Sequence, residues 1–311
     1  MNKTLTTALA ISALAVNVVG ATSNNTVGGT NNTISATSTS SAVWGFQNNI
    51  NANNALAFGT NNTVTGENGF AGGNNATAAG RNSFAFGSHA ESLVEYTVAI
   101  GNQARVNSHN SVAIGNGAFV SGESSVVLGR TNNVTGKNSV AIGANNGTVA
   151  GGQSAVVGYN NKIGADKEQL VFGSNSESSG QGALVFGTHS KAVAMDAVAF
   201  GNNTIADKPN AVAIGTNSVT DDAVGVDGIT INGTPHVFAG KQPASVVSFG
   251  SKARAGAGGV TQYNRQLTNV SAGQISADSL DAVNGSQLFA AVAEIETNAK
   301  QTKHYYDRRR Y

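Results

Sequence analysis

The stretch Asn110-Ser111-Val112-Ala113-Ile114-Gly115 recurs almost unchanged at Asn138-Ser139-Val140-Ala141-Ile142-Gly143. Its apolar core, four residues that end in glycine, returns from Leu56-Ala57-Phe58-Gly59 to Val212-Ala213-Ile214-Gly215. Successive terminal glycines lie 14 residues apart, except for two intervals of 15 residues, from Gly143 to Gly158 and from there to Gly173. A fixed short period is the signature of a repeat architecture.

A unit of this length is too short for a helix-turn-helix pair and fits one coil of two short strands and two turns. The apolar segment forms the first strand, and its glycine supplies a backbone conformation closed to residues with a Cβ. The polar half, such as Asn61-Asn62-Thr63-Val64-Thr65-Gly66, forms the second strand and turn. Its Asn pairs suit turns and side-chain ladders between coils. The sequence predicts an all-β parallel solenoid of about 14-residue coils, a rod roughly 65 Å long at ~4.8 Å per coil.

Composition agrees with a stacked repeat and excludes several functions. The chain has 311 residues with 39 glycines, 3 prolines and 11% charged residues, and its net charge is +1. We therefore expect no broad electrostatic field that recruits nucleic acid. The absence of cysteine excludes disulfides, thiolate metal sites and cysteine nucleophiles.

The strong strand is apolar on both faces, which requires cover on both faces. In Val112-Ala113-Ile114, the Val and Ile side chains point one way and the Ala side chain points the other. We expect Val and Ile to fill the coil and the Ala row to form an outer stripe that contacts identical chains. The alternative is a monomer that tolerates an exposed Ala stripe. The candidate trimer contacts in the repeat are Ala57, Ala85, Ala99, Ala113, Ala141, Ala199 and Ala213.

The N-terminal sequence is typical of a secretory signal. One lysine, Lys3, precedes the mostly apolar run 5–19, and Val18-Val19-Gly20-Ala21 ends on a small residue. We predict cleavage after Ala21, so residues 1–21 are the signal peptide. A membrane anchor is the alternative, although the run is short and Asn17 interrupts it.

The rest of the chain divides into four regions: repeats over 22–216, a neck with an insertion over 217–278, a coiled-coil start over 279–303, and a basic aromatic tail over 304–311. Gly228–Pro235 suggests a hairpin, and Asp278-Ser279 is a good helix N-cap pair. Leu288, Val292 and Ile295 have heptad spacing and are further candidate trimer contacts.

The repeat Asn110–Gly115 resembles the head repeat of the YadA-like trimeric autotransporter adhesins. Asp281–Leu288 is similar to the entry of their stalk. The residues that resemble their neck are Phe238, Gly240, Phe249, Gly250, Arg265, Gln266, Asn269, Val270 and Gly273.

The resemblance implies a left-handed β-roll, a homotrimer, and a neck that leads onto a three-stranded coiled coil. It also implies display on a Gram-negative cell and attachment to host extracellular-matrix proteins or cell-surface receptors. The family anchors itself through four C-terminal amphipathic strands per chain, and three chains complete one outer-membrane barrel. This sequence contains no such run, so we expect an anchor outside this chain or a released product.

The chemistry-bearing residues point to no catalytic, cofactor or metal site. The five histidines show no metal-ligand spacing, and no Gly-x-Ser-x-Gly motif accompanies them. Asp221, Asp222 and Asp227 suit turn caps or a cation. We therefore predict a protein that is not an enzyme. The alternatives are a secreted structural, ice-binding or polymer-binding solenoid, whose ice-binding form needs one register of Thr-x-Thr, and a β-helical enzyme, which needs clustered carboxylates.

Overall fold

The structure is a computed structural model that describes residues 17–18, 24–256 and 259–308. Most of the predicted signal peptide, residues 1–16 and 19–21, lies outside the described residues. Two compact units are distinguished. One is the rod, which runs to Thr220 and includes Val247–Ser251, and the other comprises Asp221–Val246 and the chain from Lys252 onward.

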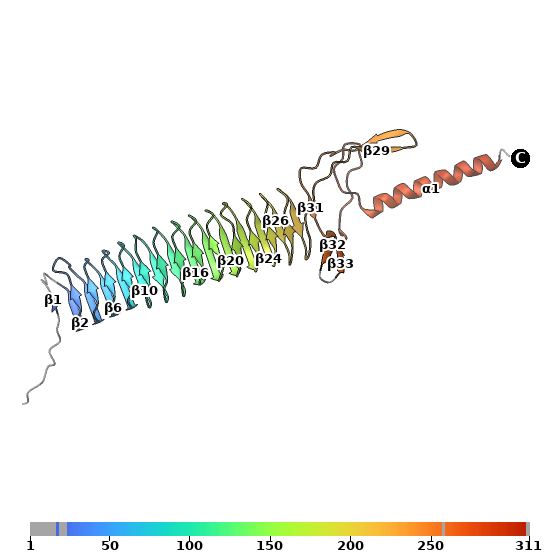
Figure 1. Cartoon of the computed structure of the whole chain (residues 1–311). Helices are drawn as coiled ribbons and strands as arrows, with labels where there is room; N and C mark the ends of the chain where they lie inside the picture. Colours follow the sequence, from blue (N-terminus) through green and yellow to red (C-terminus); the bar gives the residue numbers. More distant parts are fainter. Residues whose placement is uncertain (1–16, 19–23, 257–258, 309–311) are drawn as a thin grey trace, which may run out of the picture. The chain divides into compact units, whose positions relative to one another are not determined.

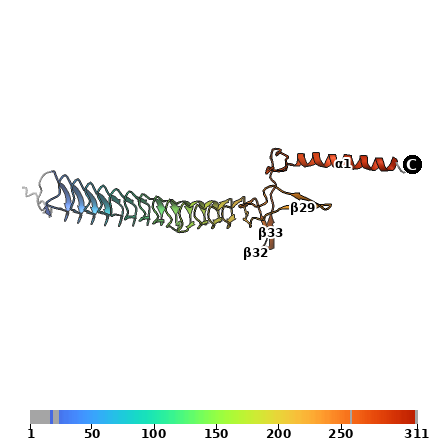
Figure 2. The same ribbon diagram turned by 90° about the horizontal axis from the view of Figure 1, so that it is seen from above.

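The rod is the predicted parallel β-solenoid, in which each coil lies directly on the next (Figure 1, Figure 2). Its long sheet has fifteen strands in the order β2-β4-β6-β8-β10-β12-β14-β16-β18-β20-β22-β24-β26-β28-β31. Equivalent residues pair between coils, as Val98, Ala99 and Ile100 do with Val112, Ala113 and Ile114. The strands are β2 (Thr26–Thr30), β4 (Ala42–Phe46), β6 (Leu56–Thr60), β8 (Phe70–Asn74), β10 (Phe84–Phe86), β12 (Val98–Ile100), β14 (Val112–Ile114), β16 (Val126–Arg130), β18 (Val140–Ala144), β20 (Ala155–Tyr159), β22 (Leu170–Ser174), β24 (Leu184–Thr188), β26 (Val198–Phe200), β28 (Val212–Ile214) and β31 (Val247–Ser248).

The opposite wall consists of two-residue strands, one from each polar half-coil. They form a ten-stranded sheet that ends at β19 and a four-stranded sheet that begins at β21, within the region of the 15-residue coils. Just before this break, Asn133 of β17 pairs with Thr148 of β19, 15 residues on. The strands are β1 (Asn17–Val18), β3 (Thr33–Ile34), β5 (Asn49–Ile50), β7 (Thr63–Val64), β9 (Thr77–Ala78), β11 (Glu91–Ser92), β13 (Arg105–Val106), β15 (Phe119–Val120), β17 (Asn133–Val134), β19 (Thr148–Val149), β21 (Lys162–Ile163), β23 (Glu177–Ser178), β25 (Lys191–Ala192) and β27 (Ile205–Ala206).

The core is thin, and it corrects the predicted orientation of the strong strand. Ala113 is fully buried inside the coil, where it meets the layer that contains Val120, whereas Ile114 is exposed. The two walls of a 14-residue coil lie close together, so the interior admits one small or medium side chain from each wall. The predicted outer Ala stripe is therefore wrong: Ala57, Ala85, Ala99, Ala113, Ala141, Ala199 and Ala213 are all 0% exposed.

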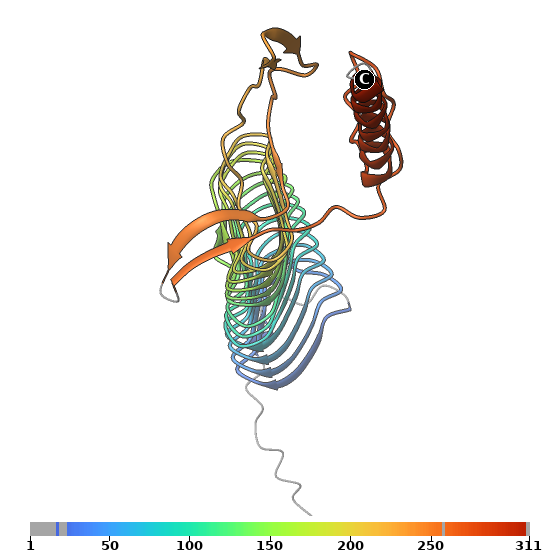
Figure 3. The same cartoon turned by 90° about the vertical axis from the view of Figure 1, so that its right-hand side faces the viewer.

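The turns explain the abundance of Asn. Each regular coil has two residues seven positions apart in the left-handed region, such as Asn61 and Asn68 at φ +55° and +57°. Asn tolerates this conformation better than most residues. The end-on view in Figure 3 shows the coils as flattened loops that superimpose along the rod.

Buried Asn side chains join successive coils, which confirms the predicted ladder. Asn62 Nδ2 donates to Asn48 Oδ1 over 2.9 Å, and Asn48 Nδ2 donates to Asn32 Oδ1 over 3.0 Å. A second run connects Asn132, Asn146 and Asn161. These amides satisfy turn backbone groups in the dry interior, where an unpaired polar group is costly.

The second unit contains two hairpins and one helix. β29 (Gly228–Ile231) pairs antiparallel with β30 (Thr234–Val237), which confirms the predicted hairpin. β32 (Ser251–Gly256) pairs with β33 (Gly259–Tyr263). The helix α1 (Gly285–Arg308) starts later than the predicted Asp278-Ser279 and continues into the predicted tail. Asn284 is its cap, because Asn284 Oδ1 accepts from the Gln287 N–H over 3.3 Å.

Candidate functional site: the exposed faces of the rod and the helix

The outer face of the long sheet carries two apolar rows. The first and third residues of each strong strand point outward, on either side of the buried second residue. The first-row side chains are half-buried by their neighbours. The third-row side chains are more exposed, and the most exposed of them are Phe58 at 59% and Phe200 at 55%. In one chain, large apolar side chains therefore face solvent along the whole rod.

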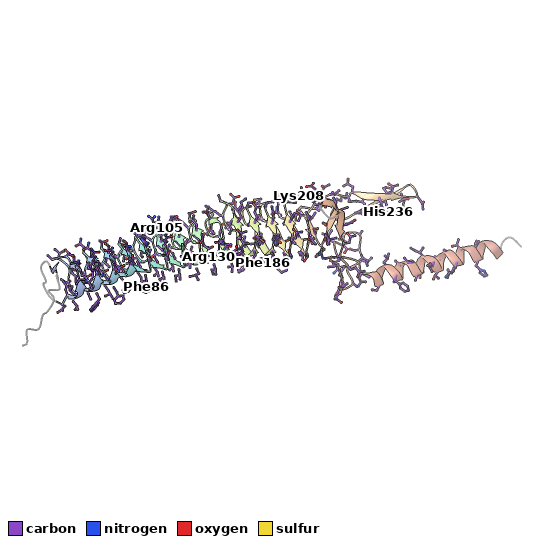
Figure 4. The ribbon with its side chains drawn as sticks, turned by 60° about the horizontal axis from the view of Figure 1, so that its bottom comes forward. Phe86, Arg105, Arg130, Phe186, Lys208 and His236 are labelled. Carbon is purple, nitrogen blue, oxygen red and sulfur yellow. The ribbon has the colours of Figure 1, made fainter. Side chains whose placement is uncertain are left out.

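Aromatic side chains concentrate in two segments of this face. Phe70 and Phe84 stack with ring centroids 4.6 Å apart, and Phe172 stacks on Phe186 at 5.5 Å. A Cβ at Gly72 would lie 2.8 Å from Phe86, so this glycine leaves room for the rings. In Figure 4, Phe86 and Phe186 lie along one side of the rod, and Arg105 lies on the opposite side.

The opposite wall is polar and carries ion pairs between coils. Arg105 Nε lies 3.0 Å from Glu91 Oε2, and Glu177 bridges Lys162 at 2.8 Å and Lys191 at 3.4 Å. The hydrogen bond from Lys162 is the main cause that lowers the pKa of Glu177, and partial burial opposes it. The outward row reads Thr63, Thr77, Glu91, Arg105, Phe119, so it is not the continuous threonine row of an ice-binding surface.

One edge of the rod carries a second line of charged residues, which is densest from Glu67 to Lys137. Arg81 Nη2 lies 3.2 Å from Glu95, and Lys137 Nζ lies 3.1 Å from Glu123. These side chains are about half exposed or more, so each pair contributes little to stability. His109 belongs to the same line and is exposed. The charged groups are spread over the solvent-facing surface and converge on no single point.

The predicted neck residues lie in both units. In the rod, Gly250 O accepts from the Val219 N–H over 2.8 Å, and Phe249 is 39% exposed. In the second unit, the Gln287 side chain makes two hydrogen bonds with the Gly273 backbone. Gln287 Nε2 donates to Gly273 O over 2.7 Å, and Gln287 Oε1 accepts from the Gly273 N–H over 3.1 Å. Asn284 Nδ2 donates to Val270 O over 3.1 Å. These bonds tie the segment before the helix to its first turn.

Other neck residues present their side chains to solvent. Phe238 and Gly240 belong to the second unit, where Phe238 is 44% exposed and a Cβ at Gly240 would meet Leu280 at 2.9 Å. Arg265, Gln266 and Asn269 are exposed, and Asn269 has a left-handed φ of +61°.

The seam of α1 has no cover within the described part of the second unit. Leu288, Val292 and Ile295 are 62%, 44% and 67% exposed. An amphipathic helix gains stability mainly by packing its apolar stripe. Within the described part of the second unit, the apolar stripe of this helix is therefore left open to a partner.

The described residues contain no group of three His, Asp or Glu side chains able to hold a metal ion. Asp221 instead pairs with Lys252 at 3.3 Å. No helix in the described parts of the chain is long and apolar enough to cross a membrane.

Comparisons with known proteins bear on the same regions. The family described as "YadA head domain repeat" matches residues 51–76, 69–90, 95–118, 121–146, 178–204, 192–218 and 206–222. The family described as "Coiled stalk of trimeric autotransporter adhesin" matches residues 266–305. The autotransporter adhesin BtaE of Brucella suis is 45% identical over 78 residues, which are 25% of this chain and 9% of that protein. The match thus spans only a small part of that relative.

Two solved structures are similar to this chain. The C-terminal YadA-like domain of a Burkholderia pseudomallei protein is 33% identical, with 43% of this chain and 53% of that chain covered and a TM-score of 0.30. The collagen-binding domain of the Yersinia adhesin YadA is 26% identical, with 70% and 87% covered and a TM-score of 0.34. These TM-scores are low, so the assignment rests on the head-repeat and stalk matches in their order along the chain. By those matches, the chain belongs to the YadA-like trimeric autotransporter adhesins.

Proposed function

We propose that this chain is the head, neck and upper stalk of a surface-displayed homotrimeric adhesin that attaches bacteria to host extracellular-matrix proteins or cell-surface receptors and supports self-association. Family membership supplies adhesion and export to the cell surface. The signal peptide over residues 1–21, the homotrimer and the class of ligand are our proposals for this chain.

The observation that carries the proposal is the apolar outer face of the fifteen-stranded sheet. Full burial of a Val, Leu, Ile or Phe side chain gains about 1.5–3 kcal/mol, and side chains of this kind repeat in nearly every coil. Identical chains present identical rows at identical heights, so cyclic symmetry brings matching residues together. We assign the trimer contact to Ile114 and its equivalents, in place of the Ala row.

The helix supports association of copies in a second region of the chain. Leu288, Val292 and Ile295 form an exposed seam with heptad spacing. Helices with such a seam pack against one another as a coiled coil. Apolar faces on both the sheet and the helix thus call for copies of the same chain.

The surfaces left free in such a trimer suit multivalent attachment. The two-residue strands display a mostly polar wall that differs in detail from coil to coil, and three chains multiply each site. Weak contacts at many linked sites give avidity without any tight single site. This fits the scattered distribution of the charged pairs, such as Arg105 with Glu91.

Attachment is tested with residues 22–311 and immobilised collagen, fibronectin and laminin. The trimer is expected to bind at least one of them, and an Ile114→Glu variant that remains folded as a monomer is expected to bind far more weakly. Failure of the trimer to bind any matrix protein or host cell, or equal binding by the monomeric variant, would contradict the proposal.

A further inference from the structure

The two ends of the long sheet are finished differently. At the C-terminal end, β31 covers β28 by pairing Val212 with Val247 and Ala213 with Ser248. That cover comes from a segment more than thirty residues further along the chain. At the N-terminal end, β2 pairs with β4 on one side, and no described residue pairs with its other side. Figure 1 shows β2 as the first strand of the long sheet.

The open side of β2 presents backbone hydrogen-bonding groups. The Thr26 N–H donates to Ser41 O over 2.9 Å, and Thr30 O accepts from the Gln47 N–H over 3.2 Å. These residues direct their groups toward the next coil. In a parallel ladder, alternate residues serve opposite neighbours, so the groups of Val27 and Gly29 point away from the rod. Such a row is a template for another strand.

The buried Asn ladder is directional and starts at the same end. Each Asn side-chain oxygen accepts from the following coil: Asn32 Oδ1 accepts from the Asn48 N–H and Nδ2, both at 3.0 Å. Asn32, which is 1% exposed, is thus the first described member of this ladder, and it lies in the first coil of the rod.

The first strand of the opposite wall would also have an unpaired outer side in the exported chain. Its first full strand, β3, is covered by β1, in which Asn17 pairs with Thr33 and Val18 with Ile34. Asn17 and Val18 belong to the predicted signal peptide. If cleavage occurs after Ala21 as predicted, it removes this strand, and no described residue then pairs with the outer side of β3.

The sequence at this end lacks the usual protection of an exposed edge. Natural edge strands carry charged residues or proline that block pairing. From Thr4 to Gly66 there is no Asp, Glu, Lys, Arg, His or Pro. Charged residues then begin at Glu67 and occur along the rest of the rod. Two such ends therefore meet without like-charge repulsion.

We propose that the N-terminal end of the rod is a self-association surface, at which β2 pairs with β2 of a second copy. A two-fold axis makes the two identical strands antiparallel and continues the long sheet from one rod into the next. The contact is self-complementary, because the same Val27 and Gly29 groups face each other. This inference rests on the proposed function in one respect: it supplies a physical route for the self-association proposed above.

The experiment uses mature residues 22–311 and follows mass by light scattering as concentration rises. A species of twice the starting mass is expected, and electron micrographs should show rods joined end to end, with a C-terminal label at both outer ends. Thr30→Lys places a charged side chain on β2, opposite Thr26 of the second copy when Val27 faces Gly29, as charged residues do on natural edge strands. It is expected to move the doubling to roughly tenfold higher concentration or beyond. Val27→Pro, which removes an N–H that points outward, should do the same.

Thr60→Lys is the matched control, because Thr60 occupies the position of Thr30 two coils further in. It should leave the doubling unchanged. The inference is overturned if the wild-type chain does not double, if rods join side to side, or if Thr60→Lys prevents doubling as well as Thr30→Lys. The doubling is measured relative to the mass of the species present at low concentration, whether that species is a monomer or a trimer. The test of end-to-end pairing is therefore independent of the test of the trimer.

Discussion

Ala113 and Ile114 are neighbours in the chain, yet Ala113 is fully buried inside the coil and Ile114 is 37% exposed on the outer face. This alternation sets the roles of the two positions. Burial of Ala113 stabilises the single chain, whereas Ile114 is available for contacts between chains. The predictions below follow from these roles and from the features that hold the coils together.

The first prediction separates the two roles by the same substitution at adjacent positions. Ala113→Glu places a carboxylate between the walls of the coil without a partner, which costs several kcal/mol and disrupts the coils around it. Ile114→Glu places the carboxylate in solvent in a single chain and leaves the fold intact. Circular dichroism and limited proteolysis measure the difference. Equal damage to the fold by both substitutions would show that the two faces have been assigned wrongly.

The Asn ladder yields the second prediction. Asn62→Ala removes side-chain hydrogen bonds to Asn48 Oδ1, Phe58 O and Gly73 O. Removal of one buried partner costs about 1–3 kcal/mol, so the denaturant midpoint should fall. Thr65→Ala, at an exposed position in the same coil, should change the midpoint little. A midpoint unaffected by Asn62→Ala would mean that the ladder does not stabilise the rod.

Close stacking of the coils gives the third prediction. A Cβ on Gly59 would lie 2.1 Å from Gly73 O, and Gly59 has φ of +119°. Gly59→Ala should therefore destabilise the rod by at least ~1–3 kcal/mol, the cost of such backbone strain. Gly285→Ala is the control, because no atom lies within 4 Å of the new Cβ at the helix start. Thermal unfolding should show a large loss at Gly59 and none at Gly285.

Sequence patterns predicted the coil, its period and its turns because each depends on local spacing. The glycine at the Gly59 position recurs in nearly every coil and the Asn at the Asn62 position in two runs of coils, and their chemistry follows from backbone conformation and hydrogen bonding. The faces of the strand were misassigned because Val, Ala and Ile are all apolar. Trp44 held a usable signal: an indole at the third position is too large for the interior and already indicated the outer face.

The helix start shows a different limit. Asp278-Ser279 has good capping chemistry, but these residues form a turn in which the Ser279 N–H donates to Ser276 O. The helix begins where Gln287 bonds both to Asn284 and to Gly273, fourteen residues earlier. Bonds between distant segments of this kind leave no periodic trace in the sequence.

The fourth prediction concerns Glu177 and pH. Its pKa is lowered in the folded state, so its contribution to stability is present above its unfolded pKa and is lost as pH falls through the lower folded pKa. At neutral pH, Glu177→Gln should lower the free energy of unfolding by less than about 1 kcal/mol, because both lysines are exposed. The denaturant midpoint should therefore fall only slightly. At a pH well below the ordinary carboxyl range, the variant and the wild type should unfold alike. An equal difference at both pH values would exclude the ion pairs as its cause.

The claim that the outer face of the long sheet joins identical chains is tested most directly by sedimentation equilibrium of residues 22–311. The measurement compares the wild type with Ile114→Glu at concentrations below any end-to-end pairing. The wild type is expected to have the mass of three chains, and the variant should keep its β signal and show a lower mass. A wild-type chain that sediments as a monomer, or a variant that remains a full trimer, would contradict the account.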